Sequence, residues 1–273
     1  MRHLQLTLLF SLTLISCEDM SLLIAKKRII SPTDQPTTGG VVFWHDDIIR
    51  IPTILTYHNN HGNSNGYIAT LALNGVTGGY IAQVQTLYNA GYELANHTET
   101  HYSTLDAYMA THTAEQYYNE HLAPVDSIIT GYGQLPLWSF VWPTGATNSV
   151  ISDWLIANNK FNILRNYSVR DYPASLGTCL AFYNGGRIAD AVATDHFYGA
   201  FAADVDYHKT MMDYAKENGL VIHFLAHDVR DEGTFNPSTD LCTSTEDINA
   251  RVAYAQEIGL PILTAKEAYE MYN

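Results

Sequence analysis

Basic residues are scarce in this sequence, which has 14 Lys and Arg residues against 28 Asp and Glu residues and a formal net charge of −14. No basic run is long enough to follow a phosphate backbone, so nucleic acid is not expected as a partner. Acidic polymers are disfavoured for the same reason, although a local basic pocket is compatible with this composition. The 273 residues, 47% of them hydrophobic, are enough for one large domain or two small ones with a sizeable core.

Cysteine is also rare, with three residues in the chain. No Cys-x-x-Cys pair occurs, so a cysteine zinc site is not supported. Cys179 and Cys242 follow the N-terminal region, and in an exported chain two such residues can pair. The sequence leaves that pairing open, because it does not give the distance between their Cα atoms.

The apolar run at residues 4–15 follows Arg2 and is too short to span a bilayer as a mature helix. It ends in Ser16-Cys17, which resembles the lipobox of bacterial lipoproteins. The resemblance implies a signal peptide at residues 1–16 and a lipid on Cys17. The membrane would then be a partner through this anchor, with the exported chain attached to the bacterial cell envelope, at the outer membrane. An ordinary secretory signal is the alternative.

A tether is expected at residues 17–38, because residues 31–40 are rich in turn formers. From there on, apolar strand patterns alternate with amphipathic helix patterns. The patterns predict strands at residues 41–44, 53–57, 92–95, 139–142, 162–167, 220–226 and 261–263, a loop at 59–66, and helices at 79–90, 114–129, 148–158, 205–217, 243–258 and 265–272. Residues 168–203 are the least regular part.

Alternation of strands with helices of ten or more residues predicts a parallel sheet. Seven or so such units favour a closed α/β barrel over an open sheet, with one domain at residues 39–273. Functional groups in such barrels lie where strands end.

Two histidines, His97 and His101, lie four residues apart just after a short apolar run. If a helical turn begins there, both imidazoles share one face. Two neutral imidazoles suit a borderline metal such as zinc, and a catalytic zinc site needs a third protein ligand.

Further polar groups stand at the ends of other expected strands: Asp46-Asp47, Pro143-Thr144-Gly145 and Leu225-Ala226-His227. Together they suit metal-assisted hydrolysis, in which one carboxylate takes a proton from water and a histidine protonates the leaving atom. Taken singly, Asp46-Asp47 would be a turn or a helix cap and His227 a core histidine.

These segments resemble the motifs of the polysaccharide deacetylases of the NodB-homology type, the family 4 carbohydrate esterases. Trp44-His45-Asp46-Asp47-Ile48 keeps the two aspartates of Thr-Phe-Asp-Asp-Gly, and Asn96-His97-Thr98-Glu99-Thr100-His101 matches His-Thr/Ser-x-x-x-His. Val141-Trp142-Pro143-Thr144-Gly145 keeps the proline and glycine of Arg-x-Pro-x-Gly, and Leu225-Ala226-His227 matches Leu-x-His. The resemblance covers about residue 40 to the C-terminus.

The resemblance implies a distorted (β/α)7 barrel and a divalent metal, zinc before cobalt or nickel. The implied roles cover metal binding, acid–base chemistry and the substrate pocket. They are metal ligation by Asp47, His97 and His101, general base Asp46, general acid His227, an oxyanion contact from the N–H of Thr144 beside Pro143, and an acyl pocket lined by Leu225.

The chain departs from the family pattern at Val141, which stands where the family has an arginine that orients the base. Arg165, at the end of the next expected strand, is the candidate substitute. The family's aspartate that orients the acid histidine has no clear counterpart. Asp204 and Asp206 are the nearest candidates, with capping of the following helix as the alternative role.

The expected function is metal-dependent hydrolysis of acetyl groups, N- or O-linked, on a carbohydrate polymer or oligosaccharide. One alternative keeps the barrel and metal but takes a small or cyclic amide. Another is a glycan-binding surface lipoprotein without catalysis, which the departures from the motifs would favour.

Overall fold

The computed structural model describes residues 39–75, 79–134 and 138–273. The expected signal peptide, the tether and Cys17 lie outside the described residues. In the ranges described, no helix is both long and apolar enough to cross a bilayer.

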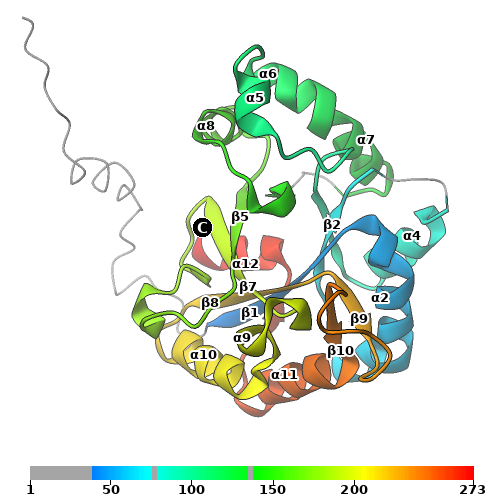
Figure 1. Cartoon of the computed structure of the whole chain (residues 1–273), viewed down its shortest axis with the longest axis vertical. Coiled ribbons are helices and arrows are strands. Elements are labelled where there is room, and N and C mark those ends of the chain that lie inside the picture. Colours follow the sequence, from blue (N-terminus) through cyan, green and yellow to red (C-terminus); the bar gives the residue numbers. More distant parts are fainter. Residues whose placement is uncertain (1–38, 76–78, 135–137) are drawn as a thin grey trace, which may run out of the picture. The chain divides into compact units, whose positions relative to one another are not determined.

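Seven parallel strands form the centre of the domain (Figure 1). Their order around the sheet is β1 (Gly40–Asp46), β2 (Thr70–Leu73), β3 (Glu93–Asn96), β4 (Ser139–Val141), β5 (Ile163–Val169), β7 (Ile188–Ala193) and β8 (Val221–Ala226). Strand β8 pairs in parallel with β1, from Gly40 opposite Val221 to His45 opposite Ala226, which closes the sheet into a barrel. The expected (β/α)7 barrel is confirmed.

Four short strands lie beside the barrel. Strand β11 (Ile262–Leu263) pairs with the first part of β1, and β6 (Phe182–Tyr183) runs antiparallel to β8. Strands β9 (Asp228–Arg230) and β10 (Cys242–Ser244) form a separate parallel pair that begins where β8 ends.

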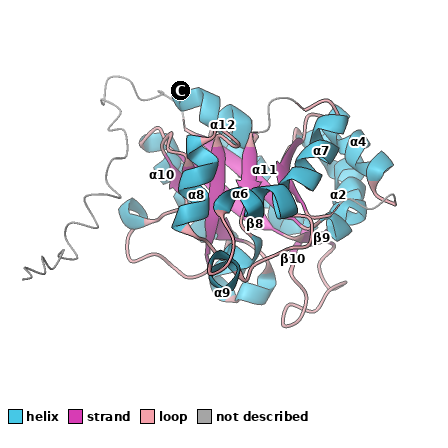
Figure 2. Ribbon diagram, turned by 90° about the horizontal axis from the view of Figure 1, so that it is seen from above, coloured by secondary structure: helices cyan, strands magenta, loops and turns pink. Residues whose placement is uncertain are grey.

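Helices surround the strands (Figure 2). They are α2 (Ile51–Tyr57), α3 (Asn63–Asn65), α4 (Ile81–Asn89), α5 (Leu105–Met109), α6 (Ala114–Tyr117), α7 (Ala123–Gly131), α8 (Ser149–Ala157), α9 (Ala200–Ala203), α10 (Val205–Glu217), α11 (Thr245–Glu257) and α12 (Ala265–Tyr272). Several begin at a side-chain cap that accepts from a first-turn N–H, such as Asn148 before α8, Ser244 before α11 and Thr264 before α12. These caps lie where the sequence patterns predicted helices to start.

Strand β1 shows how the two faces of the barrel differ, because successive side chains point to opposite faces. Phe43 packs outward against Tyr67, with ring centroids 5.1 Å apart. Trp44 points inward, where its Nε1 donates a hydrogen bond to Nδ1 of His223 at 3.0 Å. The next inward residue is Asp46, at the carboxyl end of the strand, which brings a carboxylate to the mouth of the barrel.

The expected strand at residues 53–57 is wrong, because this segment lies in helix α2. Its buried residues Ile51, Ile54 and Tyr57 recur every third position, which is helical spacing. The second strand of the barrel is instead β2, which no sequence pattern predicted.

The expected loop at residues 59–66 is also wrong over most of its length. A π-helical segment, His58–Gly62, continues from α2 and leads into α3. Gly66 then ends the helix in the left-handed region, with φ of 68°.

Cys179 and Cys242 are both buried and both free. The pairing that the sequence left open does not form in this structure.

Candidate metal and catalytic site

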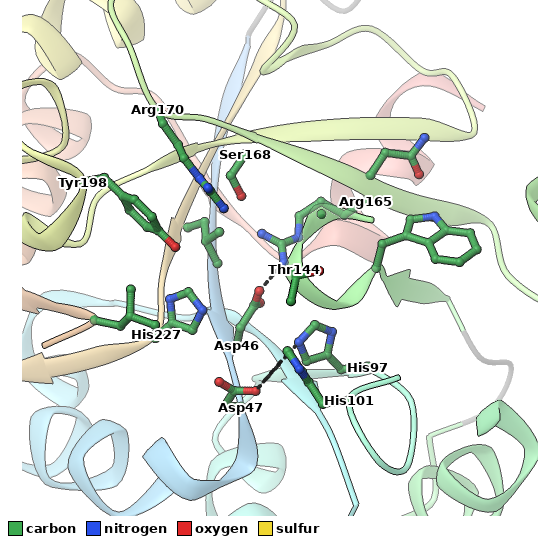
Figure 3. A pocket seen from close by; sticks show the side chains of 15 residues that line it. Asp46, Asp47, His97, His101, Thr144, Arg165, Ser168, Arg170, Tyr198 and His227 are labelled. Atoms are coloured by element: carbon green, nitrogen blue, oxygen red, sulfur yellow. Dashed lines mark hydrogen bonds and ion pairs between the residues drawn. The ribbon is translucent and has the colours of Figure 1, made fainter. Parts of the chain in front are cut away.

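Three side chains at the carboxyl end of the barrel converge as a candidate metal site (Figure 3). Ligand atoms of Asp47, His97 and His101 all lie within 4.8 Å of one another. Oδ1 of Asp47 lies 3.8 Å from Nε2 of His97 and 3.7 Å from Nε2 of His101. Tetrahedral zinc with bonds of about 2.1 Å holds its ligand atoms about 3.4 Å apart, so the three groups fit one ion with small adjustments.

His97 is oriented by a backbone contact on its other ring nitrogen. Its Nδ1 lies 2.9 Å from the carbonyl oxygen of Val141, so Nδ1 carries the proton and Nε2 keeps its lone pair free. Burial, only partly opposed by Asp46 and Asp47, lowers the pKa of His97, which favours the neutral form that a metal requires.

The two histidines reach the site without a helix, so the condition of a helical turn after His97 is not met. The segment is a loop in which Thr98 and His101 have φ of 63° and 55°. This backbone brings the two imidazole centroids to 4.9 Å.

Asp47 and Thr144 also have positive φ, of 75° and 56°. Four of the five non-glycine residues with positive φ in the described chain therefore lie at this site or beside it. Left-handed backbone costs a non-glycine residue free energy and concentrates at functional sites.

Asp46 lies beside the candidate metal ligands and forms an ion pair with Arg165 through Oδ2 and an Nη atom. Both side chains are buried. Burial alone would disfavour the Asp46 charge, but the Arg165 guanidinium, helped by His97 and His227, holds the pKa of Asp46 below its ordinary value. The carboxylate is therefore kept ionised and fixed in position.

Arg165 reaches Asp46 because of its register on the sheet. It stands directly opposite Val141 on the neighbouring strand, so the two residues are at the same height on the barrel wall. A guanidinium from Arg165 can thus occupy the region that a long side chain at position 141 would occupy.

His227 follows the end of β8 and faces the same cavity (Figure 3). Its Nδ1 lies 2.7 Å from Oδ2 of Asp195, and its backbone N–H donates to Oδ1 of Asp195 at 2.9 Å. Burial opposes protonation, but Asp195, with smaller contributions from Asp46 and Asp47, raises the pKa of His227 to about 9. His227 thus has the features of a proton donor held in one orientation.

The aspartate that orients His227 is Asp195, so the expectation of Asp204 or Asp206 is wrong. Asp204 caps α10 by accepting from the N–H of Tyr207, and Asp206 is an exposed partner of Lys209. Asp195 follows strand β7, whose small residues give a weak strand pattern. The sequence signal for Asp195 is its position two residues after the end of β7. That strand lies within residues 168–203, for which no regular pattern was found.

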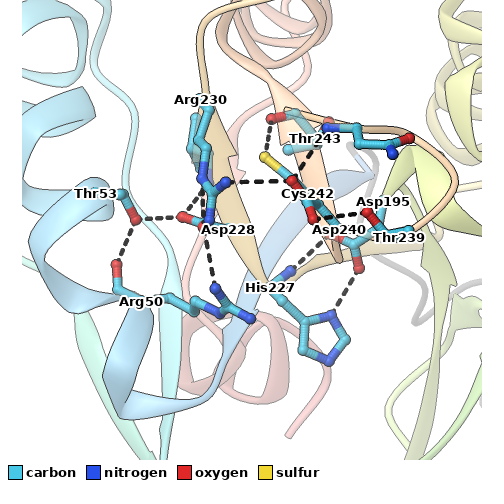
Figure 4. A network of polar contacts seen from close by, with 12 residues as sticks. Arg50, Thr53, Asp195, His227, Asp228, Arg230, Thr239, Asp240, Cys242 and Thr243 are labelled. Atoms are coloured by element: carbon cyan, nitrogen blue, oxygen red, sulfur yellow. Dashed lines mark hydrogen bonds and ion pairs between the residues drawn. The ribbon is translucent and has the colours of Figure 1, made fainter. Parts of the chain in front are cut away.

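A second network fixes the turn after β1 against the end of β8 (Figure 4). The buried Asp228 carboxylate accepts from Nη1 of Arg50 at 3.3 Å and from Nε of Arg230 at 2.9 Å, and it also accepts from Thr53. Arg50 closes the turn that carries Asp47, while Asp228 directly follows His227. The network therefore links the turn that carries Asp47, a candidate metal ligand, to the segment that carries His227.

The site opens into a cavity of about 180 Å³. Leu225 and Thr144 line it together with all five residues of the candidate metal and acid–base set. Pro143 does not line it, and instead begins the 3-10 turn Pro143–Gly145 that presents Thr144. Several further residues line the cavity that no sequence motif predicted as lining, namely Trp142, Asn166, Ser168, Arg170, Tyr198 and Leu241.

Comparison with sequence families found no family model that matches the chain, and no curated protein matches it. Solved structures do match. They include the peptidoglycan N-acetylglucosamine deacetylase Bc1960, at TM-score 0.53 and 15% identity over 85% of this chain and 91% of that one. A family 4 carbohydrate esterase from Streptomyces lividans matches at TM-score 0.50 and 19% identity, over 81% and 90% of the two chains.

A pseudoenzyme of the same family from Bacillus anthracis matches at TM-score 0.52 and 15% identity, over 86% of this chain and 66% of that one. Active and inactive proteins therefore share this architecture, and at such identities the likeness concerns the fold alone. The chain is thus similar in fold to the family 4 carbohydrate esterases, which include deacetylases of peptidoglycan.

Proposed function

We propose that this chain is a metal-dependent hydrolase that removes acetyl groups from a carbohydrate. The observation that supports it most is the arrangement within one cavity. A three-ligand metal set, Asp47, His97 and His101, has an ionised carboxylate beside it at Asp46 and a held, protonated histidine at His227. Hydrolysis of an amide or ester needs these groups together.

When bound to the three ligands, a divalent metal supplies Lewis acidity, which brings the pKa of a water molecule to about 7. Asp46 accepts a proton from the attacking water, whose oxygen forms the new bond to the acetyl carbon. Arg165 keeps the Asp46 carboxylate in place for this step.

The carbonyl oxygen becomes negative as water adds. The Thr144 N–H, in the first turn of a short helix and without a partner inside it, can donate to that oxygen. His227 gives its proton to the leaving nitrogen or oxygen as the bond to the acetyl carbon breaks. The products are acetate and a free amino or hydroxyl group. Leu225, which lines the cavity, would provide an apolar wall for the acetyl methyl.

The test combines metal content with acetate release. We expect purified chain loaded with zinc, cobalt or nickel to hold about one ion, and His101→Ala to lose it. His112→Ala is a matched control, because this imidazole stacks on Tyr108 outside the cavity lining. Acetate should be released from N- or O-acetylated oligosaccharides by wild type and control only.

The other outcomes separate the alternatives. Metal binding with turnover of small or cyclic amides, and without acetate release, would make the chain an amide hydrolase and not a carbohydrate deacetylase. No metal in wild type after loading would overturn the hydrolase and leave a glycan-binding protein.

We further propose that the chain is exported and attached to the bacterial cell envelope through a lipid on Cys17. The support is the Ser16-Cys17 ending of a short apolar run. Labelled palmitate should enter the wild-type chain in bacteria and not Cys17→Ala. Labelling that persists in the variant, or is absent from both, would contradict the anchor.

A further inference from the structure

Arg170 is a cation on the cavity wall that has no acidic partner among the residues the structure describes. Two arginines line the cavity, and Arg165 is paired with Asp46. Across the described parts of the chain, no carboxylate lies within ion-pair distance of Arg170, whose side chain is exposed. In a chain of net charge −14, an unpaired arginine at the candidate site needs an explanation.

The guanidinium of Arg170 is held over an aromatic ring. Its Cζ lies 4.5 Å from the ring centroid of Tyr198, which is a cation–π distance. Attraction to the ring is electrostatic and uses no hydrogen bond, so this contact does not take up the N–H donors of the guanidinium. Arg170 is therefore held in place while its hydrogen-bonding edge stays available.

Figure 3 shows Arg170 and Tyr198 on the same side of the cavity, both directed towards Asp46 and His227. The electrostatics of the Tyr198 hydroxyl are consistent with this position. Burial raises the pKa of Tyr198, the charge of Arg170 lowers it, and the charges of Asp195 and Asp46 raise it. All three charged groups therefore lie near the hydroxyl. The pair thus adjoins the acid–base groups and lies in the same cavity.

An irregularity in strand β5 directs Arg170 to this wall. Arg165 pairs with Ala189, but the register shifts at the next residue, so that Ser168 pairs with Ala191. Ala189 and Ala191 are two residues apart and share a face, hence so do Arg165 and Ser168. Arg170, two residues beyond Ser168, follows on that face, whereas regular alternation from Arg165 would have turned it away.

We propose that Arg170, held by Tyr198, binds a carboxylate of the saccharide whose acetyl group is removed, so that the preferred substrate is an acidic sugar such as an acetylated uronate. A guanidinium edge matches a carboxylate in a bidentate geometry. This inference rests on the proposed function and names its substrate class.

The net charge of the chain does not oppose a short acidic ligand. Repulsion between exposed charges is largely screened beyond about 8 Å at physiological ionic strength, whereas contact at Arg170 is direct. Oligosaccharides with one or a few carboxylates therefore suit the site better than densely charged polymers.

The experiment measures binding first, on the metal-loaded full chain, by calorimetry. The probes are a glucuronate-containing oligosaccharide with free carboxylates and the same compound methyl-esterified. We expect wild type to bind the free acid at least about tenfold more tightly than the methyl ester. This ratio corresponds to the lower end of the contribution of a hydrogen bond to a charged group. Arg170→Gln should abolish this preference, and Arg170→Lys should keep part of it.

Lys209→Gln is the matched control, because it removes a half-buried cation that pairs with Asp206 on α10 and does not line the cavity. It should keep the full preference. Equal affinity of wild type for acid and ester, or an equal loss for both probes in Arg170→Gln, would overturn the inference.

Acetate release is measured separately, on acetylated forms of both probes. A carboxylate preference in binding without acetate release would retain the Arg170 site and reject the hydrolase. Acetate release without any preference between the probes would retain the hydrolase and reject the role of Arg170.

Discussion

Arg165 pairs with Asp46, as expected of a substitute for the arginine that the resemblance to the family 4 carbohydrate esterases would place at position 141. The arginine that pairs with Asp46 comes from β5 and not from β4, yet positions 165 and 141 are direct neighbours in the sheet register. An arginine on one strand can therefore take the place of an arginine at the paired position of the neighbouring strand. The valine at position 141 is thus matched by an arginine at the neighbouring position in the sheet.

Replacing Arg165 by Met should leave the buried Asp46 carboxylate without its cation. We expect acetate release to fall about 10²-fold or more, the range of a lost acid–base group. Metal content should be retained, because Arg165 contacts none of the three candidate ligands. Adding Val141→Arg to this variant should restore part of the activity. Failure of that rescue, with the fold intact by circular dichroism, would contradict the register argument.

Asp195→Asn should weaken the contact between residue 195 and the His227 imidazole while keeping the size and shape of the side chain. The amide can still contact the ring, but it loses the charge that stabilises a protonated imidazole. We expect kcat for acetate release to fall about 10²-fold, with metal content unchanged. Asp206→Asn is the control at an exposed carboxylate and should behave as wild type. A variant at Asp195 with full kcat would mean that His227 is oriented by other groups.

At the scale of elements, a buried carboxylate ties the amino-terminal ends of several strands together. Glu93 begins β3 and accepts from Oγ of Ser139 at 2.6 Å, from Oγ1 of Thr70 at 3.3 Å and from the N–H of Lys266 at 2.7 Å. It therefore connects β2, β4 and α12 at the end of the barrel opposite the site. Burial outweighs these bonds and raises the pKa of Glu93 to about 7.

This shift predicts a pH dependence of stability. Since the folded state binds the proton more tightly than the unfolded state, the contribution of Glu93 is fully present below about pH 4.5 and is lost as pH rises through 7. The free energy of unfolding should fall by about 3 kcal/mol over this range from Glu93 alone. Glu93→Gln should remove that part, as measured by urea unfolding at pH 5 and pH 7.5.

The control for this measurement is Glu115→Gln, at an exposed position in α6. It should keep the wild-type difference between the two pH values. If Glu93→Gln shows the same difference as wild type, Glu93 is ionised throughout and the prediction is wrong.

At the scale of the whole molecule, closure of the barrel is what assembles the site. The candidate metal ligands come from the segments after β1 and β3, and the acid–base groups from β1, β5, β7 and β8. A metal that binds the folded chain alone should therefore stabilise the entire domain.

At a free metal concentration of 100 times Kd, the gain is about 2.7 kcal/mol, which for a domain of this size raises Tm by about 5 to 10 °C. We expect this rise for zinc or cobalt with wild type, its reversal by a chelator, and its absence in His101→Ala. Differential scanning calorimetry measures it. An equal rise in the variant would indicate metal binding elsewhere.

The sequence by itself determined the alternation of strands and helices, and hence the parallel barrel, because apolar spacing is local information. It also gave Asp46, Asp47, His97, His101 and His227 as candidates, since each lies at or shortly after a strand end in a recognisable motif, and all five line one cavity. It was wrong about α2, where a short apolar segment satisfies strand and helix patterns alike.

Only the tertiary structure identified the aspartate that supports that set, and only it could test Arg165, which the sequence offered as a candidate. Asp195 reaches His227 from 32 positions away, and Arg165 reaches Asp46 from 119 positions away. The left-handed backbone at His101 and the register shift after Arg165 likewise leave no local pattern. These features depend on strand register and barrel closure, which bring distant residues together through pairings that no stretch of sequence contains.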